Sequence, residues 1–282
     1  MIVDWLPTPS QHFLVSAVAL LVYILTSRAR DQRRAPTSAI AWVLGLALVP
    51  YLMLPQYILF GQRKLKPVAI PYAGVVVEGP HWAAELIESF GLAPPSKCTV
   101  QMHADGQQAR EALYRIIDGA QHTLDISTFI IGSDEFGRDI VARLARRARD
   151  GVKVRLLLDG FFALLVPGKY VRELNGAGVQ VAVFRPFFSL RRLGPRNLRN
   201  HRKLVVADDC CLWCGGRNLA GEYFLGDSAG VIWPDLSFDL RGPVAAAAGH
   251  QFDLDWNTTH LRVPIRARES ASIEGGALAQ FL

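Results

Sequence analysis

Two long apolar runs at the start of the chain constrain its fold more than any other feature. The first run, Phe13 to Leu25, is unbroken. The second run, Ala39 to Phe60, is interrupted mainly by Pro50, Pro55 and Gln56. A helix needs about 20 residues to cross a bilayer, which the second run supplies and the first supplies together with its flanks. The sequence therefore predicts a transmembrane hairpin in residues 1–62, with spans at about 6–26 and 39–60.

A cleaved signal peptide is the alternative for the first run, but such peptides carry basic residues before the apolar stretch. Here the basic residues follow it: Arg28, Arg30, Arg33 and Arg34. Three more follow the second run: Arg63, Lys64 and Lys66. The positive-inside rule then slightly favours an inside loop, with the N-terminus and the rest of the chain outside.

The chain beyond the second run is long enough for one sizeable soluble domain. Between Phe184 and Ala207 it contains no acidic residue. Basic and aromatic residues alternate there: Arg185, Phe187, Phe188, Arg191, Arg192, Arg196, Arg199, Arg202 and Lys203. Such a stretch fits single-stranded nucleic acid or an anionic lipid surface. The predicted anchor favours a lipid bilayer, and no nucleic-acid partner is expected.

Strand-like and helix-like patterns alternate from residue 99 onward. The expected strands are 99–103, 123–131, 152–158, 179–184, 204–207, 210–214 and 236–241. The expected helices are 107–118, 138–150, 170–177 and 244–256. Early crossover helices and a late hairpin, linked by Asp208 and Asp209, predict an α/β fold with a mixed sheet flanked by helices.

The same patterns predict the division of the chain. Residues 63–98 are expected to be a connector and residues 99–260 one α/β domain. Residues 261–282 follow that domain, and the resemblance described below makes them the start of a linker to a missing second half. No internal repeat is evident in the sequence.

A histidine, a lysine and an aspartate stand in the order His-x-Lys-x-x-x-x-Asp: His201, Lys203 and Asp208. In a strand, side chains two residues apart share a face, so His201 and Lys203 can reach one ligand together. The lysine can neutralise phosphate charge while the histidine forms a covalent intermediate. This pattern predicts a phosphoryl-transfer site.

These residues resemble the HKD motif of the phospholipase D superfamily, and two later segments extend the resemblance. They are Gly215-Gly216-Arg217-Asn218 and Trp233-Pro234-Asp235. With the predicted membrane hairpin, the chain is most similar to bacterial cardiolipin synthases, over its whole length but over only half of such an enzyme. The resemblance implies a phospholipase D-like domain that needs no metal or other cofactor.

The activity that this resemblance implies is phosphatidyl transfer. Two molecules of the anionic phospholipid phosphatidylglycerol would give cardiolipin and glycerol through a phosphohistidine intermediate. The implied location is the bacterial inner membrane, with a multi-pass anchor. Two alternatives stay open: a phospholipase D-type hydrolase of lipid or nucleic acid, and a catalytically incompetent membrane protein that binds anionic lipid.

The resemblance assigns His201, Lys203 and Asp208 to the catalytic set. His201 is the expected nucleophile or its acid–base counterpart, and Lys203 is expected to hold phosphate oxygens. Asp208 falls at the predicted hairpin turn, which favours a supporting role over contact with substrate.

Three residues are expected to bind the substrate phosphate and one to orient the histidine. The first group is Asn218 with Gly215 and Gly216, whose missing side chains allow a ligand close to the backbone. Asp235 is expected to fix the tautomer of His201. Residues 161–166 are either an apolar wall for acyl chains or a buried helical turn.

Enzymes of this superfamily combine two HKD motifs, and this sequence holds one. None of the other histidines has a lysine two residues later: His12, His81, His103, His122, His250 and His260. We therefore expect an incomplete chain that needs a missing C-terminal half or a second subunit. Cys210, Cys211 and Cys214 are interpreted as small apolar strand residues, without a metal or a disulfide.

Overall fold

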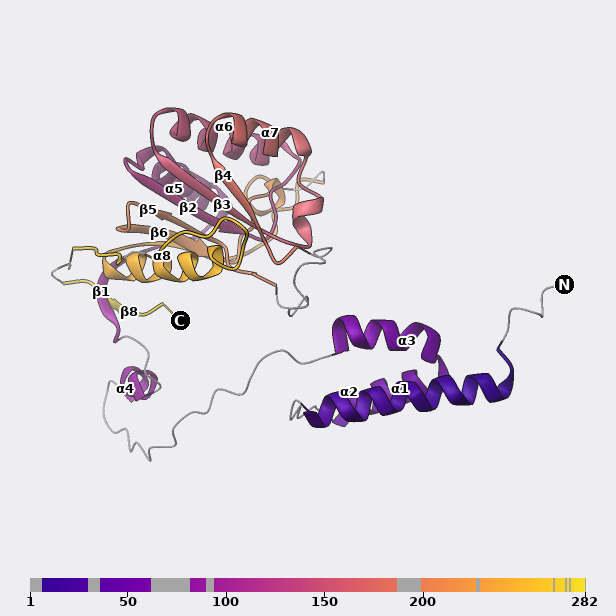
Figure 1. The fold of residues 1–282 in the computed structure, drawn as a ribbon. Helices are drawn as coiled ribbons and strands as arrows, with labels where there is room; N and C mark the ends of the chain where they lie inside the picture. The colour runs from indigo at the N-terminus through magenta and orange to yellow at the C-terminus, as the bar shows by residue number, and fades with distance from the viewer. Residues whose placement is uncertain are drawn as a thin grey trace. The chain divides into compact units, whose positions relative to one another are not determined.

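The computed structural model describes residues 7–29, 36–61, 82–89, 94–186, 199–226, 229–265, 267–271, 273 and 275–281. These residues form two compact units, a helical N-terminal unit and a larger α/β unit, and each is described by itself (Figure 1). Several sequence features lie outside the described residues: Arg30, Arg33, Arg34, Arg63, Lys64, Lys66, most of the expected connector, and the basic stretch at 187–198.

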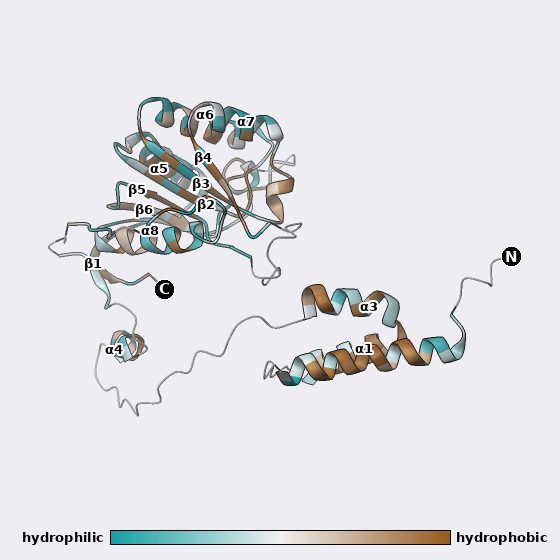
Figure 2. Cartoon of the chain, in the orientation of Figure 1, coloured by the Kyte–Doolittle hydropathy of each residue, from teal (hydrophilic) through white to brown (hydrophobic). Residues whose placement is uncertain are grey.

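The N-terminal unit contains three helices, and one of them is long enough to cross a membrane. They are α1 (Pro9–Ala29), α2 (Pro36–Leu48) and α3 (Pro50–Gln56), the last continuing as a π-helical turn, Tyr57–Gly61. Among the described helices, α1 alone has spanning length and apolar composition, over Pro9–Arg28. Figure 2 shows its surface as mostly hydrophobic.

The second expected span, 39–60, is wrong as one continuous helix. The helix stops at Leu48, and Val49 has φ −136° and ψ 57° before Pro50 starts α3. Proline lacks the N–H that would continue the helix, and its ring disfavours the α conformation in the preceding residue. The proline that the sequence places within the apolar run therefore divides it into two short helices.

The α/β unit is built on a mixed sheet, as expected. Its described strands are β1 (Ser96–His103), β2 (Thr123–Thr128), β3 (Lys153–Asp159), β4 (Gln180–Phe184), β5 (Leu204–Ala207), β6 (Cys211–Gly215), β7 (Ser237–Arg241) and β8 (Ala277–Ala279). Their order in the sheet is β4-β3-β2-β5-β6-β7-β1-β8. β2, β3 and β4 pair in parallel, and the remaining pairs are antiparallel.

Helices cover both faces of this sheet (Figure 1). One face packs against α5 (Gly106–Gly119), α6 (Glu135–Arg149) and α7 (Gly168–Gly176), and the other against α8 (Pro243–Trp256). Asp105 and Asp134 cap α5 and α6 by accepting backbone N–H groups at 2.8 Å. A carboxylate at this position also favours the positive end of the helix dipole.

Most expected elements of the α/β unit agree with the structure to within a few residues. The expected strand at 123–131 is shorter, since β2 ends at Thr128. Two short elements were not expected: α4 (Trp82–Ser89) and the edge strand β8.

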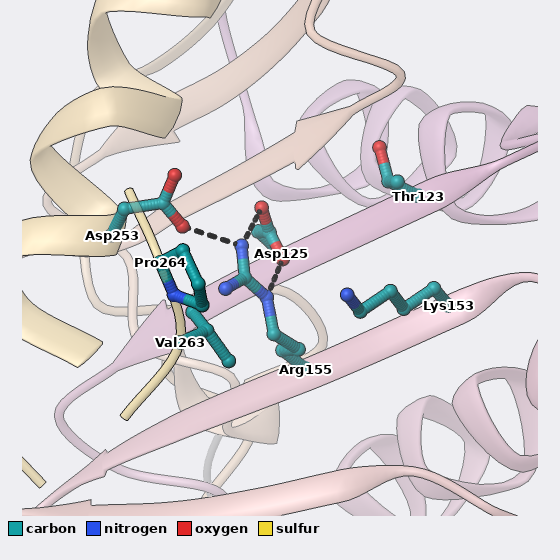
Figure 3. A pocket seen from close by; sticks show the side chains of 7 residues that line it. All are labelled: Thr123, Asp125, Lys153, Arg155, Asp253, Val263 and Pro264. Atoms are coloured by element: carbon teal, nitrogen blue, oxygen red, sulfur yellow. Dashed lines mark hydrogen bonds and ion pairs between the residues drawn. The ribbon is translucent and has the colours of Figure 1, made fainter. Parts of the chain in front are cut away.

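A network of buried ion pairs joins the sheet to α8. The Arg155 guanidinium donates to Asp125 at 2.6 Å and to Asp253 at 2.8 Å (Figure 3). Arg268 contacts the same two carboxylates and also Asp209. Burial tends to raise the pKa of Asp253, but its bonds to Arg268 and Arg155 outweigh this and lower it. This carboxylate therefore contributes stability at neutral pH that is lost as the pH falls.

Arg268 and β8 both lie in the segment expected to start a linker, residues 261–282. The side chain of Arg268 is 1% exposed, and β8 pairs with the first residues of β1. The boundary expected near residue 260 stays a prediction, although these two elements contact the α/β unit.

Removing Arg268 should destabilise the α/β unit. In Arg268→Ala, Asp125 and Asp253 keep their burial and lose one of their two cations, so the free energy of unfolding should fall by about 3 kcal/mol. The measurement is denaturant unfolding of the detergent-solubilised chain. The matched control is Arg262→Ala, an exposed arginine on the same segment, which should stay within about 0.5 kcal/mol of the parent. Equal stabilities for the two variants would contradict this account of the network.

Candidate active site

Strands that run in opposite directions begin or end side by side along one edge of the sheet, the edge formed by the strand ends and not by an outer strand. Ser127 of β2 pairs with Leu204 of β5, Leu204 pairs with Cys214 of β6, and Cys214 pairs with Phe238 of β7. Because β5 and β7 run against β2 and β6, their first residues lie beside the last residues of those strands. The segments that enter β5 and β7 and leave β2, β3 and β6 therefore share this edge.

His201 and Lys203 lie at this edge, directly before β5. β5 begins at Leu204, as expected, so the two residues lie in the segment that enters the strand and not in the strand itself. Their side chains nevertheless converge: Lys203 Nζ donates to His201 Nε2 at 2.8 Å and to the His201 carbonyl oxygen at 2.9 Å. His201 is exposed and Lys203 is 5% exposed. The imidazole therefore forms the outer part of the pair and the ammonium its floor.

This pair has the protonation states that attack on phosphorus needs. Burial, and next the charge of Lys203, lower the pKa of His201, so its imidazole is neutral at pH 7. An ammonium can only donate, so Nε2 accepts and the ring proton is assigned to Nδ1. Burial lowers the pKa of Lys203 to about 8, against the opposing charge of Asp235. Lys203 is thus a cation at pH 7 that loses its proton at mildly alkaline pH.

Asp159, which the sequence analysis missed, positions the segment that carries His201. This buried carboxylate, 1% exposed, accepts the N–H of Asn200 at 3.0 Å and the N–H of Phe161 at 2.9 Å. Its charge also favours the protonated form of His201. The sequence signal for this role was an aspartate at the end of a buried strand. Its partners lie 41 and 2 residues away in the chain, and the distant one could not be identified from the sequence.

Phe129 was also missed, and it packs against the catalytic candidates. Its ring centroid lies 4.6 Å from that of His201 in an edge-on arrangement and 5.3 Å from Lys203 Nζ. On the other side it contacts Phe162, with centroids 4.5 Å apart. This ring limits the orientations open to the imidazole and joins the site to the loop after β3.

Asp208 does not reach the site, because it follows β5 and so lies at the opposite edge of the sheet. It occupies the β5–β6 turn with φ 52°, as expected, and its carboxylate accepts N–H groups of Gln121, His122 and Thr123, each at 2.8 Å. Burial tends to raise the pKa of Asp208, but these bonds outweigh it and lower the pKa. These contacts are those of a residue that holds the turn, which is the supporting role expected, and the place of Asp208 in the catalytic set stays a prediction.

The three expected phosphate ligands lie at the same edge as His201. Asn218 is 4% exposed and donates from Nδ2 to the Tyr223 hydroxyl at 2.8 Å. A side chain at Gly215 or Gly216 would overlap Leu236 or Asp235, so the group seen near both glycines is the 235–236 segment. Their contact with a phosphate stays a prediction.

The charge of Asp235 acts on Lys203 and not on His201. Its charge raises the pKa of Lys203, while Asp159 is the carboxylate that acts on His201. Among the described residues no hydrogen bond joins Asp235 to His201, so the expected orienting contact is absent. Sequence spacing alone could not distinguish these two carboxylates.

Two exposed apolar loops lie at the same end of the strands as the histidine, and we call them together the apolar rim. One loop follows β3, and the other precedes β7. Its large exposed side chains are Phe161, Leu164, Leu165, Val231, Ile232 and Trp233, each 45–68% exposed. Phe162 connects the first loop to Phe129, and Trp233 contacts Tyr223, the partner of Asn218. Of the segment 161–166, Phe162–Leu164 form a 3-10 helical turn, but Phe161, Leu164 and Leu165 are exposed, so the turn is not a buried one.

The cysteines fit the sequence interpretation only in part. Cys211 and Cys214 lie on β6, but Cys210 is exposed in the preceding turn, with its Sγ 3.5 Å from that of Cys211. In the described part of the chain, no group of three or more histidine, cysteine or acidic residues could hold a metal ion.

Comparisons with known proteins agree with the resemblance read from the motif. A family model described as cardiolipin synthase, PLD-like domain, matches residues 113–233. Cardiolipin synthase A of Pseudomonas putida (strain W619) is 29% identical over 297 residues, which cover 96% of this chain and 61% of that protein. Cardiolipin synthase 1 of Bacillus cereus is 29% identical over 248 residues, which cover 80% of this chain and 49% of that protein.

A solved structure, NucT from Helicobacter pylori, has a TM-score of 0.45 and 14% identity, covering 58% of this chain and 98% of that chain. The chain thus spans between about half and two thirds of the length of the curated relatives named above. The matched segment contains His201, Lys203, Asn218 and the strands that bring them to one edge. Residues 113–233 of this chain are similar to the PLD-like domain of cardiolipin synthases.

Proposed function

We propose that this chain supplies one of the two HKD motifs of a phosphatidyl transferase that makes cardiolipin from two molecules of phosphatidylglycerol. The observation that carries the proposal is the contact of 2.8 Å between Lys203 Nζ and His201 Nε2, at an edge bordered by the apolar rim. The second motif comes from a further half of the protein or from a second subunit. The family and the printed names of the relatives support the reaction.

In the first step the phosphate displaces the imidazole from the ammonium. Lys203 Nζ turns to a non-bridging phosphate oxygen, which frees the Nε2 lone pair of His201. Nε2 attacks phosphorus, the N–P bond forms, and the P–O bond to glycerol breaks. The histidine of the second motif protonates the departing glycerol oxygen. The negative charge that develops on phosphorus is stabilised by the ammonium below it.

In the second step another phosphatidylglycerol is the acceptor. Its free hydroxyl gives a proton to the second histidine, and its oxygen attacks phosphorus. The N–P bond breaks, its electron pair returns to His201, and cardiolipin is released. Neither step needs an oxidant, a reductant or a metal, since two imidazoles and the lysines account for charge and protons.

The apolar rim favours a lipid substrate over the alternatives. Exposed aromatic and aliphatic side chains beside basic residues suit the boundary between headgroups and acyl chains. Arg202, 40% exposed, adjoins His201 in the sequence. We infer that the enzyme acts at the bacterial inner membrane, where α1 anchors it. Hydrolysis to phosphatidic acid, and lipid binding without chemistry, are the competing outcomes.

Replacing the proposed nucleophile separates these outcomes. Full-length protein in membranes is given labelled phosphatidylglycerol; cardiolipin and glycerol are expected, and His201→Ala should lower their rate by about 10³-fold or more. The control is His250→Ala, an exposed histidine on α8, which should leave the rate unchanged. Phosphatidic acid as the main product would support hydrolysis, and an unchanged substrate pool would support binding alone.

The rate should depend on pH through both members of the pair. His201 must be neutral and Lys203 charged, so kcat/KM should fall as the pH drops below the ordinary range of histidine and fall again as it rises through about 8. In Lys203→Arg the guanidinium keeps its charge, so the alkaline fall should disappear even if the rate is lower. An alkaline fall that is identical in both proteins would assign it to another group.

The apolar rim should matter for bilayer substrates and not for soluble ones. The double variant Leu164→Asp/Leu165→Asp should lose about 10-fold in rate on phosphatidylglycerol vesicles, because two apolar contacts with the bilayer are replaced by charge. Its rate on a monomeric short-chain substrate should stay near that of the parent. Leu254→Asp, an exposed leucine on α8, is the control. Equal losses on both substrates would indicate a structural role for the loop.

A further inference from the structure

The second apolar run folds into two short helices, and neither is long enough to span a bilayer. α2 has 13 residues, which corresponds to about 20 Å of helix. α3 and its π-helical turn together have 7 + 5 = 12 residues, or about 18 Å. The hydrocarbon core is about 30 Å thick. Each helix therefore reaches only part of the way across.

The contacts of α2 show how far it runs back along α1. Ser16, in the first half of α1, donates from its hydroxyl to the carbonyl oxygen of Ala47 at 2.9 Å, one residue before α2 ends. α2 begins at Pro36, seven positions after the end of α1, and its last turn lies beside the first half of α1, so it runs antiparallel to α1. It stops level with Ser16, well inside the span Pro9–Arg28.

The contacts of α3 show that the chain then reverses. Tyr51, at the start of α3, lies beside His12, with ring centroids 5.8 Å apart. Tyr57 lies at the other end of α1, where its hydroxyl is 2.7 Å from that of Thr26. α3 therefore runs parallel to α1 and returns the chain to the end of α1 that it left before α2. Figure 1 shows this return of α3 along α1 and α2.

The turn between α2 and α3 suits a position inside the membrane. The hydroxyl of Ser16 satisfies a carbonyl group near the break, and Met53 donates its N–H to the Val49 carbonyl at 3.0 Å. Non-helical backbone at membrane depth is tolerated only where such groups find partners within the protein. Outward-facing side chains of all three helices are large and apolar: Phe13, Leu21, Leu44, Leu48, Leu52 and Ile58.

This path changes how the basic residues divide between the two sides. Four arginines lie in the last turn of α1 or after it, at positions 28, 30, 33 and 34, and three basic residues follow the π-helical turn, at positions 63, 64 and 66. With two complete spans they would lie on opposite sides, four against three. With the reversal at Val49 they lie on one side, 4 + 3 = 7, and the tail before α1 has no lysine or arginine. The positive-inside rule then gives one clear orientation.

We propose that α2 and α3 form a re-entrant hairpin beside a single spanning helix, so that the phospholipase D-like domain leaves the bilayer on the cytoplasmic side. The N-terminal tail then lies on the opposite side. This replaces the orientation that two complete spans would give. Resting on the proposed function, it also names the substrate pool: phosphatidylglycerol is taken from the cytoplasmic leaflet.

Cysteine accessibility in cells tests the proposal without any need for activity. Cys210 is a native exposed cysteine in the domain, and Thr8→Cys and Gln32→Cys place reporters before α1 and in the loop after it. The reporters are introduced into Cys210→Ser, and Cys210 itself is read in the parent. Spheroplasts are treated with a membrane-impermeant maleimide, before and after permeabilisation.

The expected result is that position 8 reacts in intact spheroplasts, whereas position 32 and Cys210 react only after permeabilisation. Reaction of position 8 and Cys210 on the same side, with position 32 on the other, would show two complete spans and overturn the re-entrant hairpin. Reaction of Cys210 in intact spheroplasts would overturn the cytoplasmic placement. Since labelling is independent of turnover, failure of the proposed reaction would leave this result unaffected, and the reverse also holds.

Discussion

The antiparallel pairing of β5 with β2 is the constraint on which the rest of the α/β unit depends. From β2 to β4 the chain builds a parallel sheet with crossover helices, and β5 then enters in the opposite direction beside β2. This reversal places the start of β5 beside the ends of β2 and β3. A histidine just before β5 can therefore feel the charge of the aspartate that ends β3, although 42 positions separate them in the chain.

The protonation states of Lys203 and His201 follow from the burial of these side chains and from the charges near them. The ammonium of Lys203 is almost covered and has an aromatic ring and an imidazole as neighbours, which explains its lowered pKa. Carboxylates stand on both sides of the pair and divide their influence, Asp159 toward His201 and Asp235 toward Lys203. A negatively charged phosphate would bring the countercharge that the ammonium lacks. By contrast, the buried charges of Arg155 and Arg268 are paired with Asp253, and these ion pairs contribute to stability.

The fold could be predicted from the sequence where local pattern decides it. Period-two and helical patterns located every strand of the sheet except β8, whose three residues pair with β1 nearly 180 positions earlier. The pairing of His201 with Lys203 was also predictable, since two extended residues on one face stay together even outside a strand. Asp159, Phe129 and the position of Asp235 were not, because they depend on which strand ends meet. The break at Val49 had a local signal in Pro50, which the apolar composition of the run concealed.

The carboxylate of Asp159 holds two separate segments, because one oxygen accepts the backbone N–H of Phe161 and the other that of Asn200. Phe161 begins the exposed loop of the apolar rim, and Asn200 precedes the nucleophile candidate. The two segments are thus mechanically linked through a single rigid group in the interior. A displacement of the loop would therefore be passed through the Asp159 carboxylate to the backbone segment that carries the imidazole.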